Sequence, residues 1–359
     1  MSFLATVEAT PNIALVKYWG DRDERLVIPM NSSISMTLDY TLRTRTTIMF
    51  SKDFSQDQVW LNREQLKDKD FDRIVGFLDL VRKKAKISYR SKIVSINGFP
   101  TAAGLASSAS GWAALAYACN IALKLKLDIR QLSILARLGS GSASRSVVGG
   151  FVELKSGKKS DGSDSYSEQI ASPEHWPELR NVIAVVDEKK KRVSSKTGMR
   201  RTVETSALYV KRTEDLQTTL KTVRSAIIKK DPVSLFQTAM RESNNMHAVM
   251  LDSWPPVMYL NNVSKEIMYA IHDLNLDGIK AGYTFDAGPN AHIITLEEHL
   301  PRVTKVLREI SDVKKTIVCG IGHGPRNIEI PEEHLIDPKR GEVRAHYWDD
   351  KLNKIVVQS

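Results

Sequence analysis

The chain has 359 residues and a hydrophobic content of 42%, which suits two ordinary domains or one large domain and excludes a disordered protein. No apolar run reaches the roughly 18 residues of a membrane-spanning helix, and the N-terminus lacks the basic and apolar regions of a secretory leader. The formal net charge of +10 indicates an anionic partner. The sequence has no zinc-finger, basic-zipper or basic–aromatic pattern of a nucleic-acid-binding protein. A small phosphorylated ligand is therefore expected, rather than nucleic acid or a membrane.

The first part of the chain predicts both strands and helices. Apolar residues alternate at Ile34, Met36 and Leu38, which predicts a half-buried strand. From Phe71 the apolar spacing changes to that of a helical face, and residues 91–96 predict a further strand. The first part of the chain is therefore expected to contain both strands and helices.

The expected domain boundary lies in the middle of the chain. A helix that ends at about Leu127 and another that ends near Leu138 precede it. The apolar run at 182–186 predicts a buried strand that opens a second domain. We expect the boundary near residues 170–182.

Helices dominate the second part. An apolar stripe from Leu216 to Ile227 predicts one helix, and Asp231 followed by Pro232 predicts the N-cap and first residue of the next. Strand character returns at 316–322. Strands and helices interleave without strict alternation, which predicts an α+β fold.

The two cysteines are far apart in the sequence. Cys119 lies in an apolar helical run, where a buried thiol is expected, and the two cysteines are too far apart in sequence to form a metal-ligand pair with each other. This usage fits a reducing compartment, and a cytoplasmic location is expected.

A loop of small residues precedes the helix that ends at about Leu127. From Thr101 to Gly111, nearly every residue is Ala, Gly, Ser or Thr. Unpaired N–H groups at a helix start bind anions, and small side chains let phosphate oxygens reach them. The loop lacks the Gly-Lys-Ser/Thr sequence of a Walker A motif. Phosphate binding and close strand–helix packing both remain open from the composition.

A second loop of small residues, 138–150, surrounds a single cation. Its serines alternate around Arg145, and hydroxyls together with a guanidinium suit a carboxylate or a phosphate. The alternative is a flexible loop with a solvated arginine. The apolar segments on both sides favour a loop that is held in place.

Two further motifs contain isolated charged residues. Asp286 lies at a Gly-Pro turn between strand-like segments, where it serves either as a general base or, as turn chemistry alone favours, as an Asx-turn. Lys17 follows an apolar run, and its side chain points either into a site or to solvent. The basic run 187–201, with Ser194 and Ser195, is either a phosphate-binding or a solvated loop. Together these groups suit phosphoryl transfer from a nucleotide to a hydroxyl of an anionic substrate.

Five motifs in this order resemble the mevalonate diphosphate decarboxylases of the GHMP kinase superfamily. They are PNIALVKYWG, PTAAGLASSASG, GSGSASRS, VSSKTGM and YTFDAGPNA. The resemblance extends from about Val7 to about Pro338 and implies the GHMP kinase-like two-domain fold, with the active site in the interdomain cleft. An S5-like N-terminal ATP-binding domain is expected at 1–178 and a C-terminal α/β domain at 179–359.

The resemblance also implies a reaction and partners. ATP and Mg2+ are used to phosphorylate the C3 hydroxyl of mevalonate 5-diphosphate, and loss of that phosphate drives decarboxylation to isopentenyl diphosphate, with release of ADP, phosphate and CO2. The implied assembly is a cytoplasmic homodimer in the mevalonate pathway.

The motifs imply roles for individual residues. Asp286 matches the catalytic aspartate that engages the C3 hydroxyl, Arg145 the arginine that orients the substrate carboxylate, and Lys17 the lysine grouped with them. The positions that match substrate-binding residues are Asn12, Tyr18, Ser140, Ser142, Ser195 and Met199. The positions expected to bind ATP are Ala103, Gly104, Ser107 and Ser108. No metal ligand is assigned.

The sequence departs from the family pattern in two places. Asp21 stands where the family often has lysine, so a cation near the diphosphate is missing, and Arg22 or Lys196 is a candidate to compensate. Ser144 replaces a cysteine, which is a small change. The change at Asp21 leaves a decarboxylase of mevalonate monophosphate as one alternative. The others are a mevalonate-type kinase, whose relatives tend to lack the set Asp286, Arg145 and Lys17, and a non-catalytic metabolite-binding protein, which would be expected to lose Asp286.

Overall fold

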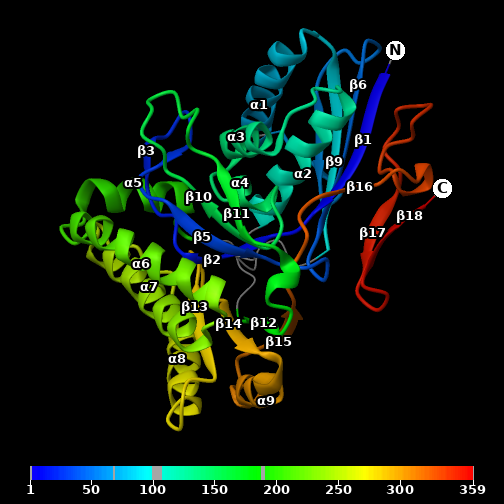
Figure 1. The fold of residues 1–359 in the computed structure, drawn as a ribbon. Helices are drawn as coiled ribbons and strands as arrows, with labels where there is room; N and C mark the ends of the chain where they lie inside the picture. Colours follow the sequence, from blue (N-terminus) through cyan, green and yellow to red (C-terminus); the bar gives the residue numbers. More distant parts are fainter. Residues whose placement is uncertain (1, 68, 99–106, 187–190, 359) are drawn as a thin grey trace.

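The computed structural model describes residues 2–67, 69–98, 107–186 and 191–358, which fold into two α+β parts (Figure 1). The first sheet has the order β16 (Arg326–Asn327), β1 (Ser2–Ala9), β6 (Thr44–Ser51), β9 (Arg90–Asn97), β7 (Gln58–Leu61), β8 (Glu64–Gln65). The second has the order β11 (Ser167–Ala171), β10 (Phe151–Leu154), β5 (Ser33–Thr37), β2 (Asn12–Val16). The third has the order β13 (Ala281–Phe285), β14 (Ala291–Leu296), β12 (Leu179–Val185), β15 (Lys315–Cys319).

Two hairpins and the helices complete the described structure. The hairpins are β3 (Asp21–Asp23) with β4 (Ile28–Pro29), and β17 (His346–Asp349) with β18 (Lys354–Val357). The α-helices are α1 (Lys69–Ala85), α2 (Ser107–Ala122), α3 (Ile129–Gly139), α4 (Ala143–Ser146), α5 (Ser195–Thr205), α6 (Tyr209–Lys229), α7 (Pro232–Asp252), α8 (Asn262–Leu274) and α9 (Leu300–Glu309). Short 3₁₀ helices lie at Pro173–His175, Glu297–His299 and Pro331–Glu333.

The second sheet lies between two layers of apolar core. Val152 of β10 packs with α2, α3 and α4 on one face, whereas Ile13 of β2 and Met36 of β5 pack with α6, α7 and the third sheet on the other. All five residues of β5 are buried, so the prediction of a strand is confirmed but its expected half-exposure is wrong. The second sheet is therefore covered on both faces.

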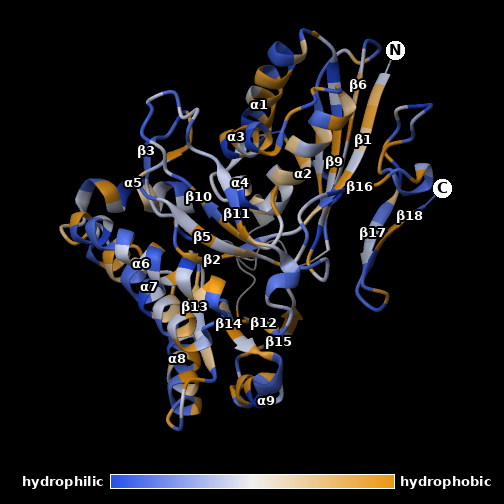
Figure 2. Cartoon of the chain, viewed as in Figure 1, coloured by the Kyte–Doolittle hydropathy of each residue, from blue (hydrophilic) through white to orange (hydrophobic). Residues whose placement is uncertain are grey.

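The helical stripes identified in the sequence are buried as amphipathic helices require. The stripe from Leu216 to Ile227 faces the core on α6, and hydrophobic and hydrophilic residues are mixed along α6, α7 and α8 (Figure 2). Asp231 is the N-cap of α7 and its side chain accepts a hydrogen bond from the Ser234 N–H, with Pro232 as the first helical residue. These predictions are confirmed.

One predicted helix ends earlier than expected. The prediction placed the end of α2 near Leu127, but the helix ends at Ala122. Lys124 and Lys126 have φ angles of 50° and 53°, and this left-handed backbone cannot continue a right-handed helix. The Asn120 side chain then accepts a hydrogen bond from the Leu127 N–H and fixes the turn into α3.

The chain after β15 returns to the first sheet. β16 pairs with β1, and the β17–β18 hairpin lies beside that sheet, far from α6, α7 and α8 (Figure 1). A Cβ atom on Gly98, at the end of β9, would lie 2.3 Å from the Trp348 ring, so the hairpin requires glycine there. The domain division at residues 178/179 stays a prediction. No helix in the described part of the chain is long and apolar enough to cross a membrane.

Candidate active site

A buried ion pair joins the second and third sheets. Lys17 directly follows β2 and Asp286 directly follows β13, and the Lys17 Nζ lies 2.7 Å from the Asp286 Oδ1. The Lys17 side chain is buried, whereas 31% of the Asp286 side chain is exposed. The carboxylate is therefore the member of the pair that a ligand can reach.

Burial and charge act in opposite directions on this pair. Burial lowers the pKa of Lys17 below its usual value, although Asp286 and Glu242 oppose the effect. Burial alone would raise the pKa of Asp286, but Lys17 outweighs it, with further contributions from His292 and Lys191, so the pKa is lowered. Asp286 is thus ionised at neutral pH and able to accept a hydrogen bond from a hydroxyl group.

The turn after β13 does not use the Asp286 side chain. The Gly288 N–H donates to the Asp286 main-chain oxygen at 2.7 Å, and the Asp286 carboxylate faces Lys17 instead. The Asx-turn that turn chemistry favoured is therefore wrong. Lys17 likewise points inward rather than to solvent.

Arg145 is a buried cation that neutral groups hold in place. Its Nε donates to the Asn12 Oδ1 at 3.2 Å, and its Nη1 donates to the Ser33 Oγ at 2.6 Å. The residue is 3% exposed, and in the described ranges no carboxylate lies within ion-pair distance of its guanidinium. Burial lowers the pKa of Arg145 to about 10, although Asp286 opposes this. A buried charge without a counter-charge is costly, so this site suits an anionic ligand.

Asn12 connects the start of β2 to the loop around Arg145. Its Nδ2 donates to the Ser142 main-chain oxygen at 3.0 Å and to the Ser146 Oγ at 2.8 Å, while its Oδ1 accepts from Arg145. The Ser140 and Ser142 hydroxyl oxygens are 3.3 Å apart in the same loop. The structure therefore brings these four predicted residues together.

Tyr18 packs against the same loop. A Cβ atom on Gly141 would lie 2.5 Å from the Tyr18 ring, so only glycine allows this approach. The Tyr18 hydroxyl donates to the Asp21 Oδ1. Burial raises the pKa of Asp21 to about 6, and nearby Glu24 adds to the increase although the Tyr18 hydrogen bond opposes it.

The two candidate cations near Asp21 differ in their contacts. Arg22 donates to the main-chain oxygens of Ser156 and Lys159, so its guanidinium is already engaged. The Lys196 Nζ lies 3.7 Å from the Glu24 Oε2 and its charge lowers the pKa of Asp21. Lys196 is therefore the better candidate to compensate for the departure at Asp21.

We expect the substitution Asp21→Asn to stabilise the protein in a pH-dependent way. A carboxyl group with a pKa raised from 3.8 to about 6 favours folding when protonated, so its contribution is lost as the pH rises through that range. The free energy of unfolding of Asp21→Asn relative to the parent should therefore increase by up to about 3 kcal/mol between about pH 4 and pH 7 and then stay constant. Urea unfolding at several pH values measures this, with exposed Asp312→Asn as the control; a pH-independent difference would contradict it.

Ser195 and Met199 lie on α5. The Lys191 Nζ donates to the Ser195 Oγ at 3.4 Å, and its charge also acts on Asp286. Met199 packs with Trp19 and Tyr259 in an apolar cluster. Lys191 was not predicted, because nothing in the basic run 187–201 distinguishes one lysine from the next.

The expected ATP-binding residues are only partly described. Ala103 and Gly104 lie outside the described residues. Ser107 is the first residue of α2, and Ser108, in its first turn, is exposed. The first-turn N–H groups of α2 are suited to phosphate oxygens, because they lack partners within the helix.

Three other polar residues near the ion pair were missed. Glu242 on α7 accepts a hydrogen bond from the Lys17 N–H at 2.9 Å and pairs with Arg212 on α6. Burial lowers the pKa of His292 to about 4, so this imidazole beside Asp286 is neutral at pH 7. No local pattern identifies these residues, since each looks like an ordinary residue of a helix or strand.

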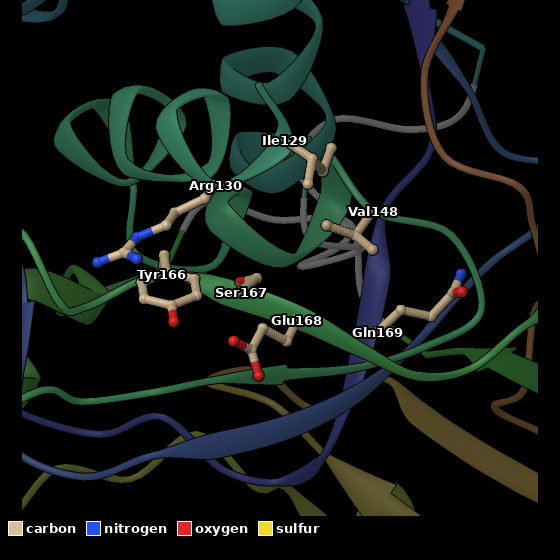
Figure 3. Close-up of a pocket in the computed structure, with 7 residues that line it drawn as sticks. All are labelled: Ile129, Arg130, Val148, Tyr166, Ser167, Glu168 and Gln169. Atoms are coloured by element: carbon tan, nitrogen blue, oxygen red, sulfur yellow. The ribbon is translucent and has the colours of Figure 1, made fainter. Parts of the chain in front are cut away.

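Two surface cavities lie away from this site. One, of about 570 Å³, is lined by residues including Arg130, Tyr166 and Glu168, whose side chains line it from α3 and the β11 region (Figure 3). The other, of about 470 Å³, includes Asp39 and His323 in its lining. Neither is lined by a predicted site residue. The described residues contain no group of three or more His, Cys, Asp or Glu side chains that would hold a metal ion.

The fold and the site are those of a two-domain α+β enzyme whose ionised aspartate, buried lysine and buried arginine, the last without an ion-pair partner among the described residues, suit an anionic substrate. Residues 9–167 match the diphosphomevalonate decarboxylase-like N-terminal domain, and residues 181–334 match the mevalonate 5-diphosphate decarboxylase C-terminal domain. The chain therefore belongs to the mevalonate diphosphate decarboxylase family.

Whole-chain similarities agree with this assignment. Human diphosphomevalonate decarboxylase is 44% identical over 93% of this chain and 96% of its own length. The crystal structure of mevalonate diphosphate decarboxylase from Staphylococcus aureus has a TM-score of 0.87 and 39% identity, covering 92% of this chain and 99% of that one. A structure described as MDDEF in complex with MVAPP, AMPPCP and magnesium has a TM-score of 0.85 and 37% identity, covering 91% and 99%. The predicted family and two-domain α+β fold are confirmed.

Proposed function

We propose that the protein catalyses the ATP-dependent decarboxylation of mevalonate 5-diphosphate to isopentenyl diphosphate, with release of ADP, phosphate and CO2. The observation that carries this proposal is Arg145, a buried cation near the Lys17–Asp286 pair that has no ion-pair partner among the described residues. A substrate carboxylate would supply the missing counter-charge, and the planar guanidinium binds a carboxylate well.

The ion pair provides the acid–base function. Asp286, with its lowered pKa and exposed edge, orients the C3 hydroxyl and accepts its proton as the oxygen attacks the terminal phosphoryl group of ATP. Lys17 holds Asp286 in its ionised form and stabilises the negative charge that develops nearby. Arg145 holds the carboxylate that later leaves as CO2, and Asn12 orients Arg145.

The surrounding polar groups receive the diphosphate. Hydroxyl groups contact phosphate oxygens as hydrogen-bond donors, and those proposed here come from Ser140 and Ser142 of the loop that Asn12 anchors. The Tyr18 hydroxyl, whose proton goes to Asp21 in this structure, would donate to a phosphate oxygen in place of that carboxylate. Ser195 adds a further hydroxyl from α5, and Met199 lines the pocket with apolar surface. These assignments follow the motif match, and the proximity of the residues supports them.

ATP binds at the start of α2 in this proposal. The helix N-terminus offers N–H donors and a favourable dipole to the phosphates. Ser107 is the first residue of this helix and Ser108 the second. Ala103 and Gly104 are assigned to ATP binding from the motif alone. Mg2+ would enter with the nucleotide and neutralise charge on its phosphates. We assign no protein ligands to the ion, because the described residues contain no cluster of metal-binding side chains.

A product assay tests this function. The protein is incubated with ATP, Mg2+ and either mevalonate 5-diphosphate or mevalonate 5-phosphate, and ADP and CO2 are both measured. Equal amounts of ADP and CO2 from the diphosphate alone support the proposal. ADP without CO2 would indicate a kinase, and CO2 from the monophosphate would indicate the other decarboxylase.

We also propose that the protein forms a homodimer and works in the cytoplasm. Free, buried Cys119 and Cys319 support a reducing compartment. An exposed apolar patch supports an interface, because large patches of this kind mark association sites. Its proposed members are the exposed residues Leu208, Val210, Leu251, Trp254 and Met258. Hydrogen bonds from the Leu208 N–H to Asp252 and from the Trp254 N–H to Thr205 hold these segments, at the adjoining ends of α5, α6 and α7, close together.

Substitutions in this patch should separate the subunits. Trp254 and Met258 are 75% and 74% exposed, so Trp254→Ser with Met258→Ser removes apolar interface area without changing the core. We expect the molar mass from light scattering to fall by half at micromolar concentration. Leu276→Ser, at an 81% exposed apolar residue elsewhere, is the control. A monomeric parent would contradict the dimer, and an unchanged mass would exclude this patch as its interface.

A further inference from the structure

The Lys17–Asp286 pair joins two strands that do not pair with each other. β2 is the edge strand of the second sheet and β13 is the edge strand of the third. No strand ladder therefore fixes how far apart their ends lie. We propose that α7 and α6 carry a clamp, formed by Glu242, Ser243 and Arg212, which sets the position of this pair; the inference rests on the proposed function.

Glu242 holds the lysine side of the pair. Its Oε1 accepts hydrogen bonds from the Lys17 N–H at 2.9 Å and from the Arg212 Nη2 at 2.6 Å, and its Oε2 accepts from the Arg212 Nη1 at 3.0 Å. The Glu242 and Arg212 side chains are 3% and 0% exposed. A buried two-point contact of this kind fixes the direction of both side chains.

Ser243, the next residue of α7, holds the aspartate side. Its hydroxyl oxygen accepts a hydrogen bond from the Phe285 N–H at 2.9 Å, and Phe285 directly precedes Asp286. Ser243 is fully buried. Because consecutive Cα atoms are about 3.8 Å apart, adjacent residues of one rigid helix fix the separation of Lys17 and Asp286.

Arg212 fixes Glu242 from a second helix. The Arg212 Nη1 also donates to the Asn245 Oδ1 at 2.5 Å, so α6 and α7 are locked together at this level. A carboxylate that served only to neutralise Arg212 would not need to reach the Lys17 main chain as well. The second acceptor role of Glu242 is what points to positioning.

The charge of Glu242 also acts on Lys17. It raises the pKa of Lys17 and so opposes the effect of burial. The charged and titratable groups of the described residues that act on this ion pair are Glu242, Arg145, Lys191, His247 and His292. Both histidines have their pKa lowered by burial to about 4, so neither changes charge near neutral pH.

The decisive variant replaces both charged partners with amides. Arg212→Gln with Glu242→Gln leaves no unpaired buried charge, so it should fold with a melting temperature close to the parent. We expect kcat to fall about tenfold or more because the pair is displaced, with the KM for ATP nearly unchanged. The basic limb of the kcat profile between about pH 6 and pH 10 should move to lower pH, because Lys17 loses the charge that raises its pKa.

Ser243→Ala separates position from charge. It removes the Phe285 hydrogen bond without removing a charge, so kcat should fall while the basic limb stays in place. Asp215→Asn, in an exposed ion pair with Lys211 on α6, is the control and should match the parent. Parental kcat in a folded double variant would overturn the clamp. If the double variant does not fold, parental kcat in Ser243→Ala overturns it instead.

A parallel variant distinguishes failure of the clamp from failure of the proposed function. Asp286→Asn is measured in the same assays. If Asp286→Asn keeps full activity, the proposed role of the ion pair is wrong. If Asp286→Asn is inactive and the clamp variants are fully active with an unchanged basic limb, only the clamp is wrong.

Discussion

Asp286→Asn is expected to fold, to bind both substrates and to lose about 10²–10⁴-fold in kcat, the usual cost of removing a positioned acid–base group. Asn keeps the size of the side chain and can still accept a hydrogen bond, but it cannot take a proton from the C3 hydroxyl. Because phosphorylation precedes carbon–carbon cleavage in the proposed reaction, ADP and CO2 should decrease together. Coupled assays of both products measure this.

The control and the folding check are as important as the assay. Asp277→Asn changes an exposed aspartate of the same part of the chain and should have parental kcat. Asp286→Asn leaves the buried Lys17 ammonium without its partner, so some loss of thermal stability is expected and circular dichroism must show a folded protein. Near-parental kcat in a folded variant would remove Asp286 from the mechanism.

The helices were predicted from sequence where local patterns are sufficient. The stripe from Leu216 to Ile227 and the Asp231 cap each depend on residues a few positions apart, so the sequence contains all of the relevant information. The end of α2 was not predicted correctly. Helices often end at a glycine in the left-handed region, but here Lys124 takes that conformation, so the sequence has no glycine to indicate the end. The burial of β5 was missed because it depends on α6 and α7, which are distant in sequence.

Some contacts of the candidate site could likewise be predicted from the sequence and others could not. Lys17, Arg145 and Asp286 were selected by motifs, and the structure places them in one buried cluster. The hydrogen bond from the Lys17 N–H to Glu242, and the ion pair of Glu242 with Arg212, were not predicted. They join segments that are far apart in the sequence, so no spacing of residues indicates them. Pairings of this kind are determined by tertiary packing alone.

Arg145→Gln is expected to separate activity from stability. An amide can still hydrogen-bond to Asn12 and Ser33, which are the two partners that hold the guanidinium. The substitution removes a buried positive charge that has no ion-pair partner among the described residues, so the free energy of unfolding should be unchanged or higher. The substrate carboxylate would lose its charged partner, and kcat/KM for mevalonate 5-diphosphate should fall by about 10²–10³-fold.

This combination is a strict test, because a residue with only a structural role would give the opposite result. If Arg145 simply held β2, β5 and α4 together, its replacement would lower the melting temperature and reduce activity in proportion to the loss of folded protein. Thermal melts and steady-state kinetics on the same preparation distinguish the two cases. Arg130→Gln, at an exposed arginine that lies over the Tyr166 ring, is the matched control and should leave both quantities close to the parent. A folded Arg145→Gln protein with parental kcat/KM would mean that the substrate carboxylate binds elsewhere, and the buried charge would then need another counter-ion.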